Sequence, residues 1–374
     1  MQDLGPRKRP SFLKEWVKAG DLAWKRSVSF QAQFPESLDP GIFTPLSRGP
    51  RNPSVPLARA QETGERISSE RLRFFDLETT GLSGGTGTIA FLAAIGRIEG
   101  DRLDLTQVFL EDFPGEGAFN EALLANFSEG DVIISYNGRA FDMPLLRTRC
   151  VMNAVALPAI AHLDALYASR RLWRRVHGGA SLGLLEREVL GIERGEDLPG
   201  AMIPEAWLGF ARTGDNPLMR AVLSHNAADI VGLARLVARI QSIFDDPRSR
   251  LSQPDVDRAG LGRSLLSVGR PDEGEELLEA ALGEGDRAAG LLLLRRYRKA
   301  GHVEDCLRVA SLLPSDYRCA AEKAKLYEWS IGDLALARHW AEESASLAER
   351  PEEAAAASRR LARLERKIKQ PGKR

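Results

Sequence analysis

Two acidic side chains stand two residues apart in the sequence FFDLETTGL, and this spacing is the first indication of chemistry. Side chains two positions apart in a β-strand point to the same face, so we expect Asp76 and Glu78 to project together. Neighbouring carboxylates on a buried strand repel each other and lose solvation, which a divalent cation would offset. All-oxygen ligation favours Mg²⁺ or Mn²⁺. Taken alone, a strand end with two solvated acids explains the motif equally well.

Two further segments carry candidate catalytic side chains. The sequence SYNGRAFDMPLL predicts a strand, a turn at Asn137 and a helix whose first turn presents Asp142. The sequence SHNAADIVGL lies in a predicted long helix, where His225 and Asp229 are four residues apart and share a face. Each segment has an ordinary explanation too, because acids favour helix N-termini and His–acid pairs at this spacing occur on many helix surfaces.

The order of these three segments resembles the exonuclease motifs of the DEDD, or DnaQ-like, branch of the RNase H-like superfamily. A strand DxE is followed by a strand-to-helix NxxxFDxPLL and a helical HxxxD, and residues 70–245 are similar to the bacterial YprB-type group. The resemblance implies an α/β fold with a mixed five-stranded sheet flanked by helices. It also implies a 3′–5′ exonuclease that hydrolyses phosphodiester bonds of single-stranded DNA or RNA with two divalent cations, Mg²⁺ or Mn²⁺. The implied metal ligands are Asp76, Glu78, Asp142 and Asp229, with His225 beside the attacking water.

The position of His225 departs from the usual family pattern. Members of the superfamily that use histidine usually place it five residues before the last aspartate. Here the histidine precedes Asp229 by four residues, which is the spacing of the members that use tyrosine. The sequence therefore leaves open whether His225 is a general base, a group that positions water or only a neighbour of the site.

Several residues beside these motifs are candidate substrate contacts. A glycine-rich turn begins at Gly81, where backbone amides could approach a terminal nucleotide, although a flexible hairpin explains the glycines equally well. Basic residues around Trp173 form a helical stripe that could follow phosphates while the indole stacks on a base, or a merely solvated face. Asp164 is expected to cap a helix in preference to acting as an outer-shell acid. The candidate substrate contacts are Thr79, Gly81, Leu82, Tyr136, Asn137, Arg170 and Arg174.

The C-terminal third has a repeated pattern. Three similar segments align on Gly269, Gly301 and Gly332, which are 32 and 31 residues apart. This spacing is typical of helix pairs that bury their apolar faces against neighbouring pairs, and the segments resemble tetratricopeptide units. Such repeats favour a protein partner. The rival hypothesis to an enzyme is therefore an adaptor whose nuclease-like domain is weak or inactive and holds nucleic acid.

Changes in composition predict five parts of the chain. Prolines and weak periodicity up to residue 70 indicate an irregular arm with one short helix at 12–19. A polar segment with two prolines after residue 244 is typical of a linker. The expected parts are the arm at 1–70, the RNase H-like domain at 71–245, the linker at 246–256, an all-α repeat domain at 257–365 and a basic tail at 366–374.

The overall composition limits the other classes of function. The 374 residues include 52 Lys and Arg and 52 Asp and Glu, so any attraction to nucleic acid must be local. The three cysteines are widely spaced, which argues against a disulfide framework and a zinc site and favours a cytoplasmic protein. The longest apolar run, at 89–95, is too short to span a membrane.

Overall fold

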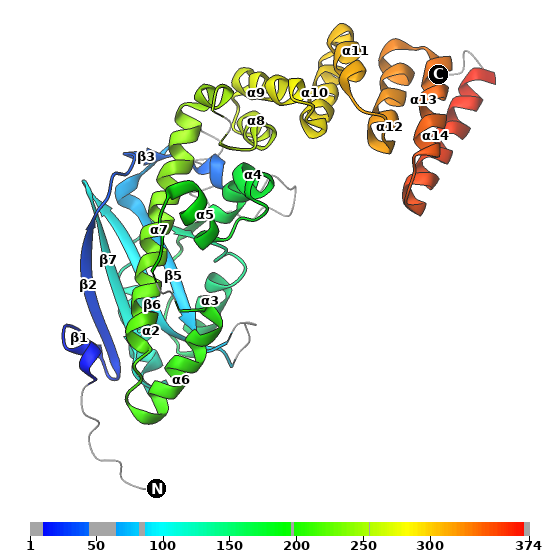
Figure 1. Cartoon of the computed structure of the whole chain (residues 1–374). Helices are drawn as coiled ribbons and strands as arrows, with labels where there is room; N and C mark the ends of the chain where they lie inside the picture. The colour runs from blue at the N-terminus through cyan, green and yellow to red at the C-terminus, as the bar shows by residue number, and fades with distance from the viewer. Residues whose placement is uncertain (1–9, 45–64, 82–86, 196–197, 254, 370–374) are drawn as a thin grey trace. The chain divides into compact units, whose positions relative to one another are not determined.

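The computed structural model describes residues 10–44, 65–81, 87–195, 198–253 and 255–369. These residues belong to two compact units, Met1–Asp246 and Pro247–Arg374 (Figure 1). The first unit is an α/β structure and the second consists of helices.

A seven-stranded mixed sheet forms the centre of the first unit. Its strand order is β1-β2-β7-β6-β5-β8-β9. Neighbouring strands from β1 to β5 are antiparallel, whereas β8 and β9 continue the sheet in parallel with β5. The strands are β1 (Val17–Gly20), β2 (Ala23–Gln31), β5 (Leu72–Thr79), β6 (Ala90–Glu99), β7 (Arg102–Leu110), β8 (Val132–Ser135) and β9 (Ala161–Asp164), and a separate pair joins β3 (Ser37–Leu38) to β4 (Ile67–Ser68).

The N-terminal segment contributes strands to the sheet that the sequence did not predict. Five strands were expected, but β1 and β2 add two more at the β7 edge, within the segment expected to be irregular. Strand β2 pairs with β7 along its whole length, from Ala23 opposite Leu110 to Gln31 opposite Arg102. Residues 12–19 form the end of a short 3-10 helix and most of β1 instead of the predicted helix. The alternation of buried and exposed residues in β2 is typical of a half-covered strand, and nearby prolines obscured it.

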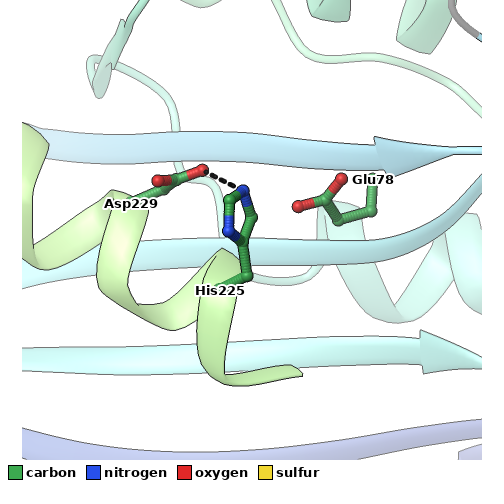
Figure 2. A group of neighbouring side chains, drawn as sticks. All are labelled: Glu78, His225 and Asp229. Atoms are coloured by element: carbon green, nitrogen blue, oxygen red, sulfur yellow. Dashed lines mark ion pairs between the residues drawn. The ribbon is translucent and has the colours of Figure 1, made fainter. Parts of the chain in front are cut away.

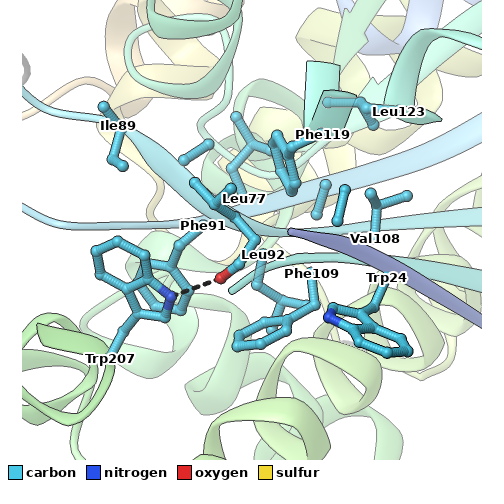
Figure 3. Packing of buried hydrophobic residues seen from close by; sticks show 14 of the residues in the cluster. Trp24, Leu77, Ile89, Phe91, Leu92, Val108, Phe109, Phe119, Leu123 and Trp207 are labelled. Atoms are coloured by element: carbon cyan, nitrogen blue, oxygen red, sulfur yellow. Dashed lines mark hydrogen bonds between the residues drawn. The ribbon is translucent and has the colours of Figure 1, made fainter. Parts of the chain in front are cut away.

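Helices cover both faces of the sheet. The long α7 (Met219–Asp245) packs on β5, β6 and β7, whereas α2 (Glu116–Leu124) packs on β1, β2 and β7. Figure 3 shows Phe119 and Leu123 of α2 on one side of the strands and Phe109 of β7 on the other. The remaining helices of this unit are α3 (Asp142–Met152), α4 (Ala165–His177), α5 (Leu182–Leu190) and α6 (Ile203–Thr213), with short 3-10 turns at Ser11–Leu13, Pro40–Phe43, Ser69–Arg71, Phe113–Gly115 and Gly200–Met202.

An aromatic contact attaches α6 to the same sheet. Trp207 stacks on Phe91 of β6 with ring centroids 5.1 Å apart. Its indole Nε1 donates a hydrogen bond of 2.8 Å to the backbone carbonyl of Leu110, as the dashed line in Figure 3 marks. Both aromatic rings are fully buried, so the polar indole N–H needs this acceptor. The contact fixes α6 beside the ends of β6 and β7.

Gly96 determines how closely α7 approaches the sheet. A Cβ atom at this position would lie 2.6 Å from Cγ2 of Ile230 and 3.3 Å from Cβ of Phe74. The distance to Ile230 is shorter than carbon atoms tolerate, so a side chain at residue 96 would displace Ile230 of α7. The face of β5 that carries Phe74 also carries Asp76 and Glu78, because these residues alternate along the strand.

The second unit confirms the predicted helical C-terminal region. The three aligned glycines follow helices, and each has a positive φ of 80° to 82°, which favours glycine. Gly262 and Gly274 allow α8 and α9 to touch, since a Cβ on Gly262 would lie 2.7 Å from the carbonyl oxygen of Gly274. The unit contains the 3-10 turn Pro247–Leu251, α8 (Arg258–Ser267), α9 (Pro271–Gly283), α10 (Arg287–Ala300), α11 (Val303–Leu312), α12 (Tyr317–Leu326), the π-helical turn η7 (Tyr327–Ile331), α13 (Leu334–Ser346) and α14 (Pro351–Lys369).

None of the helices in the described ranges combines the length and the apolar character needed to cross a membrane. The three cysteines, Cys150, Cys306 and Cys319, are buried free thiols.

The close approach of α7 predicts the effect of Gly96→Ala. The added methyl group would collide with Ile230, so we expect the free energy of unfolding to fall by about 1 to 3 kcal/mol. Urea denaturation would measure this loss. Gly87→Ala is the matched control, because no atom lies within 4 Å of a Cβ at that position. Equal stability of Gly96→Ala and wild type would contradict the proposed constraint.

Candidate metal centre

The first two predicted acids lie side by side on β5. Asp76 pairs with Ala94 of β6 and Glu78 pairs with Leu92, so both acids point to the face covered by α7. The intervening residues, Phe75 and Leu77, are 0% and 7% exposed and belong to the apolar core. The strand therefore presents two carboxylates on one face and apolar side chains on the other, as the DxE spacing predicts.

Helix α7 brings His225 and Asp229 to the same place. Ligand atoms of Glu78, His225 and Asp229 all lie within 4.8 Å of one another. Nε2 of His225 is 3.5 Å from Oδ2 of Asp229, and Figure 2 shows the imidazole ring between the two carboxylates. The four-residue spacing that shares a helix face thus directs both side chains toward β5.

A tight turn carries the backbone into Asp142 at the start of α3. Asn137 has a φ of 65°, a left-handed conformation that Asn tolerates better than most residues. Gly138 follows, and a Cβ there would lie 2.7 Å from Oδ2 of Asp142. The NG sequence therefore fits a turn that passes directly beside the Asp142 carboxylate.

Asp164 anchors this turn from the neighbouring strand. Its carboxylate accepts hydrogen bonds from the backbone amides of Asn137, at 2.8 Å, and Arg139, at 3.1 Å. It also accepts from Leu166 and so caps α4, as the sequence predicts. Asp164 is only 4% exposed, and one buried side chain thus ties β9 and α4 to the turn before Asp142.

The acids share one electrostatic environment. Burial raises the pKa of Asp76 well above its ordinary value, and the charges of Asp229, Glu78 and Asp142 raise it further. A hydrogen bond from Asn226 acts in the opposite direction. Burial also raises the pKa of Asp142 to about 7, although a backbone hydrogen bond lowers it and the charge of Asp164 raises it. This concentration of negative charge is what a hard divalent cation would neutralise.

Asn226 is a functional candidate that sequence reasoning missed. It is fully buried, and its Nδ2 donates a hydrogen bond of 2.8 Å to Oδ2 of Asp76. Its Oδ1 accepts a bond of 2.9 Å from Gln107 of β7, which is also fully buried and donates to the carbonyl of Leu223. One signal was available, because Asn226 precedes Ile230 by four residues and lies on the apolar stripe of α7.

Arg194 is a second residue beside the site that the sequence did not indicate. Its Nη2 donates a hydrogen bond of 2.5 Å to Oδ1 of Asp229, and its Nε lies 2.7 Å from Oε2 of Glu186. Glu186 on α5 is 1% exposed and fits against α7 only because residue 232 is a glycine. Arg194 lies between α5 and the 3-10 turn before α6, where no periodicity predicts its direction. It offsets part of the negative charge at the site.

The predicted substrate contacts have diverse environments. Oγ1 of Thr79 donates to the carbonyl of Gly81 at 2.8 Å, and Leu82 lies outside the described residues. The hydroxyl of Tyr136 donates to the carbonyl of Ala180 at 2.5 Å, and burial raises its pKa to about 12. The backbone amide of Asn137 donates a hydrogen bond to Asp164.

The basic stripe on α4 requires one correction. Arg170 and Arg174 are exposed as predicted, but Trp173 is 1% exposed and belongs to the interior. It is unavailable to stack on a base. Arg171 does not face solvent freely either, because it donates to the backbone carbonyls of Ile42 and Thr44.

The raised pKa of Asp142 predicts a pH dependence for the metal-free protein. Its pKa is about 7 in the folded state, against an ordinary value of 3.8, so folding favours the protonated carboxyl. Stability should therefore decline as the pH rises from about 4 to about 7. Thermal unfolding in EDTA should show that Asp142→Asn gains stability relative to wild type over this range. A difference between the two proteins that does not change with pH would contradict this expectation.

The Arg194 cluster predicts a loss of stability for Arg194→Gln. Glu186 would remain buried without its cation, so we expect unfolding to become easier by about 3 kcal/mol. Adding Glu186→Gln should restore part of the loss, because the unpaired buried charge is then removed. Arg187→Gln is the control on α5, since its pair with Glu188 is exposed. Strictly additive effects of the two cluster substitutions in urea denaturation would contradict this coupling.

Comparisons with known proteins identify the superfamily to which the first unit belongs. A sequence profile of the RNase H superfamily matches residues 73–241. The uncharacterized protein YprB of Bacillus subtilis (strain 168) is 31% identical over 320 residues, which cover 80% of this chain and 76% of that protein. The family B DNA polymerase of the hyperthermophilic archaeon Pyrobaculum calidifontis aligns with 16% identity and a TM-score of 0.37, over 57% of this chain and 28% of the polymerase chain. This chain belongs to the YprB family and carries an RNase H superfamily domain at residues 73–241.

Proposed function

We propose that this chain is a metal-dependent nuclease that removes nucleotides from the 3′ end of single-stranded DNA or RNA. The observation that carries the proposal is the gathering of acids from separate segments around Asp76, whose pKa is raised by burial and by the charges of the other three. A fold does not retain such repulsion without a compensating role, and perturbed carboxyls mark functional sites more often than structural ones.

The donor set fits divalent metal ions of the Mg²⁺ or Mn²⁺ type. Asp76, Glu78, Asp142 and Asp229 supply carboxylate oxygens, which hard cations prefer. We assign two cations to these four residues. When bound, such cations would activate a water molecule and stabilise the leaving 3′ oxygen of a phosphodiester.

The protein's own residues hold this arrangement in place. Asn226 donates to Asp76 and so fixes one carboxylate against the sheet. Arg194 fixes the orientation of Asp229 from the other side. We assign His225 to positioning the attacking water, because its ring lies between Glu78 and Asp229 and can accept or donate a hydrogen bond there. This assignment agrees with the spacing of His225 and Asp229. Members of the superfamily with this four-residue spacing use a tyrosine, whose hydroxyl can position water through a hydrogen bond.

Substrate contacts lie near the acids in the sequence and on α4. We assign the terminal nucleotide to the segment of Thr79, Gly81 and Leu82 and to Tyr136 and Asn137. Arg170 and Arg174, which are exposed on α4, are assigned to phosphates. We further propose that residues 257–365 are tetratricopeptide-like repeats that hold a protein partner.

One observation favours a second function, that of an adaptor without catalysis. Arg194 already pairs with Asp229 and offsets the charge that a cation would need. If this ion pair persists, the domain would hold nucleic acid without cleaving it. Titration with Mn²⁺ separates the two functions, because an adaptor of this kind should bind no cation that depends on Asp142 or Asp229.

The nuclease proposal predicts that Asp76→Asn loses at least a thousandfold in rate, because one ligand and its charge are removed while the side-chain shape is kept. The assay follows 5′-labelled single-stranded DNA and RNA with Mg²⁺ or Mn²⁺. Glu129→Gln, an exposed acid changed to its amide, is the matched control and should cleave like wild type. Internal cuts in place of a ladder would indicate an endonuclease. No shortening of any substrate by wild type, or equal activity of Asp76→Asn, would refute the proposal.

A further inference from the structure

Two buried glutamates in the second unit each hold three basic side chains. Glu322 on α12 and Glu328 on η7 have side chains that are 5% and 0% exposed. Each acid lies within 4 Å of three cationic groups. Those around Glu322 are Arg295, Arg298 and Lys325, and those around Glu328 are Arg360, Arg363 and Lys367. We call these six side chains the basic cluster.

The basic cluster carries more positive charge than its two acids neutralise. Burial alone would raise the pKa of Glu328, but hydrogen bonds from Arg363 and Lys367 lower it to about 2. Both acids lie beneath the surface, whereas the side chains of Arg295 and Lys367 are 52% and 43% exposed. The groups that face solvent are therefore cations, and the two anions are buried beneath them. A surface of this kind attracts polyanions.

Trp329 lies within this cluster. Its guanidinium neighbours are Arg298, Arg360 and Arg363, whose central carbons are 5.6 to 5.8 Å from the indole centroid. These contacts hold the ring, which projects from η7, between arginines of α10 and α14. The ring is nevertheless 56% exposed, and all five other tryptophans of the chain are buried or half-buried. A π-helical turn carries Trp329, and such turns are frequent at functional sites.

We infer that this surface binds single-stranded nucleic acid, with a base stacked on Trp329 and backbone phosphates on the basic cluster. An exposed aromatic ring fixed among arginines is the arrangement that stacks bases without reading their sequence. The cations match the phosphate charges on either side of a stacked base. An acidic peptide would use the cations but leave the flat indole uncovered, so nucleic acid fits more of the surface.

This site lies wholly within the second unit and extends the proposed function by a second contact for the substrate class. It requires no catalysis. Binding is therefore measured in EDTA, where the proposed nuclease would not act, so that failure of either proposal can be recognised separately.

The test is fluorescence anisotropy of a labelled 20-nucleotide oligo-dT and oligo-U with the full chain in EDTA. Trp329→Ala should weaken binding at least fivefold, and Trp329→Phe should weaken it less, because a smaller ring remains. Combined Arg295→Gln and Lys367→Gln should reduce the salt dependence of binding, since fewer counterions are released. Leu336→Ala and Arg338→Gln, exposed residues on α13, are the matched controls and should bind like wild type.

A second measurement covers the event that Trp329→Ala does not fold. Ultraviolet cross-linking of a 5-iodouracil oligonucleotide to the wild-type chain should label a peptide that contains Trp329. Wild-type affinity in a folded Trp329→Ala chain, together with no cross-link in this peptide, would overturn the inference. Displacement of the oligonucleotide by poly-glutamate at equal charge concentration would also overturn it, and would indicate an acidic protein partner.

Discussion

The contact between α7 and the sheet is the constraint on which the candidate metal centre depends. Gly96 removes the side chain that would hold the helix away, and Ile230 fills the space. Gln107 and Asn226 then connect β7, α7 and Asp76 by buried hydrogen bonds. Both amides are fully buried, so the loss of either hydrogen-bond partner would lower the stability of the fold. The register of α7 on the strands, and hence the position of the acids, follows from this packing.

That packing brings like charges together, and the surrounding residues limit the cost. Backbone amides donate hydrogen bonds that stabilise the carboxylate of Asp164, which in turn fixes the turn before Asp142. Arg194 bridges Asp229 to Glu186, so one guanidinium faces two acids. Asp76 accepts a hydrogen bond from a neutral amide, which lowers its pKa, but burial and the charges of Asp229, Glu78 and Asp142 raise that pKa well above its ordinary value. The repulsion is therefore concentrated at the centre of the site, where a cation would have the greatest effect.

Local patterns in the sequence predicted the elements that carry the acids. The DxE spacing determines a common face for Asp76 and Glu78, and the HxxxD spacing does the same for His225 and Asp229. Such periodicities reveal which side chains share a face, but not which element a face will meet. Asn226 could have been noticed, since a polar residue stood in an apolar stripe. Arg194 could not, because an irregular segment has no period and its partners are 8 and 35 residues away.

The same limit explains why the predictions for the segment of β2 and for Trp173 were wrong. Strand β2 forms because β7 offers it a partner more than 70 residues later, and the prolines around it gave the stronger local pattern. Trp173 stands among arginines in the sequence and is 1% exposed, whereas Trp329 has arginine neighbours only in the folded chain and is 56% exposed. What separates them is the packing of α4 against the first unit's interior and the short π-helical turn that ends α12. Aromatic residues beside basic ones thus become interpretable only when tertiary structure shows which ring reaches solvent.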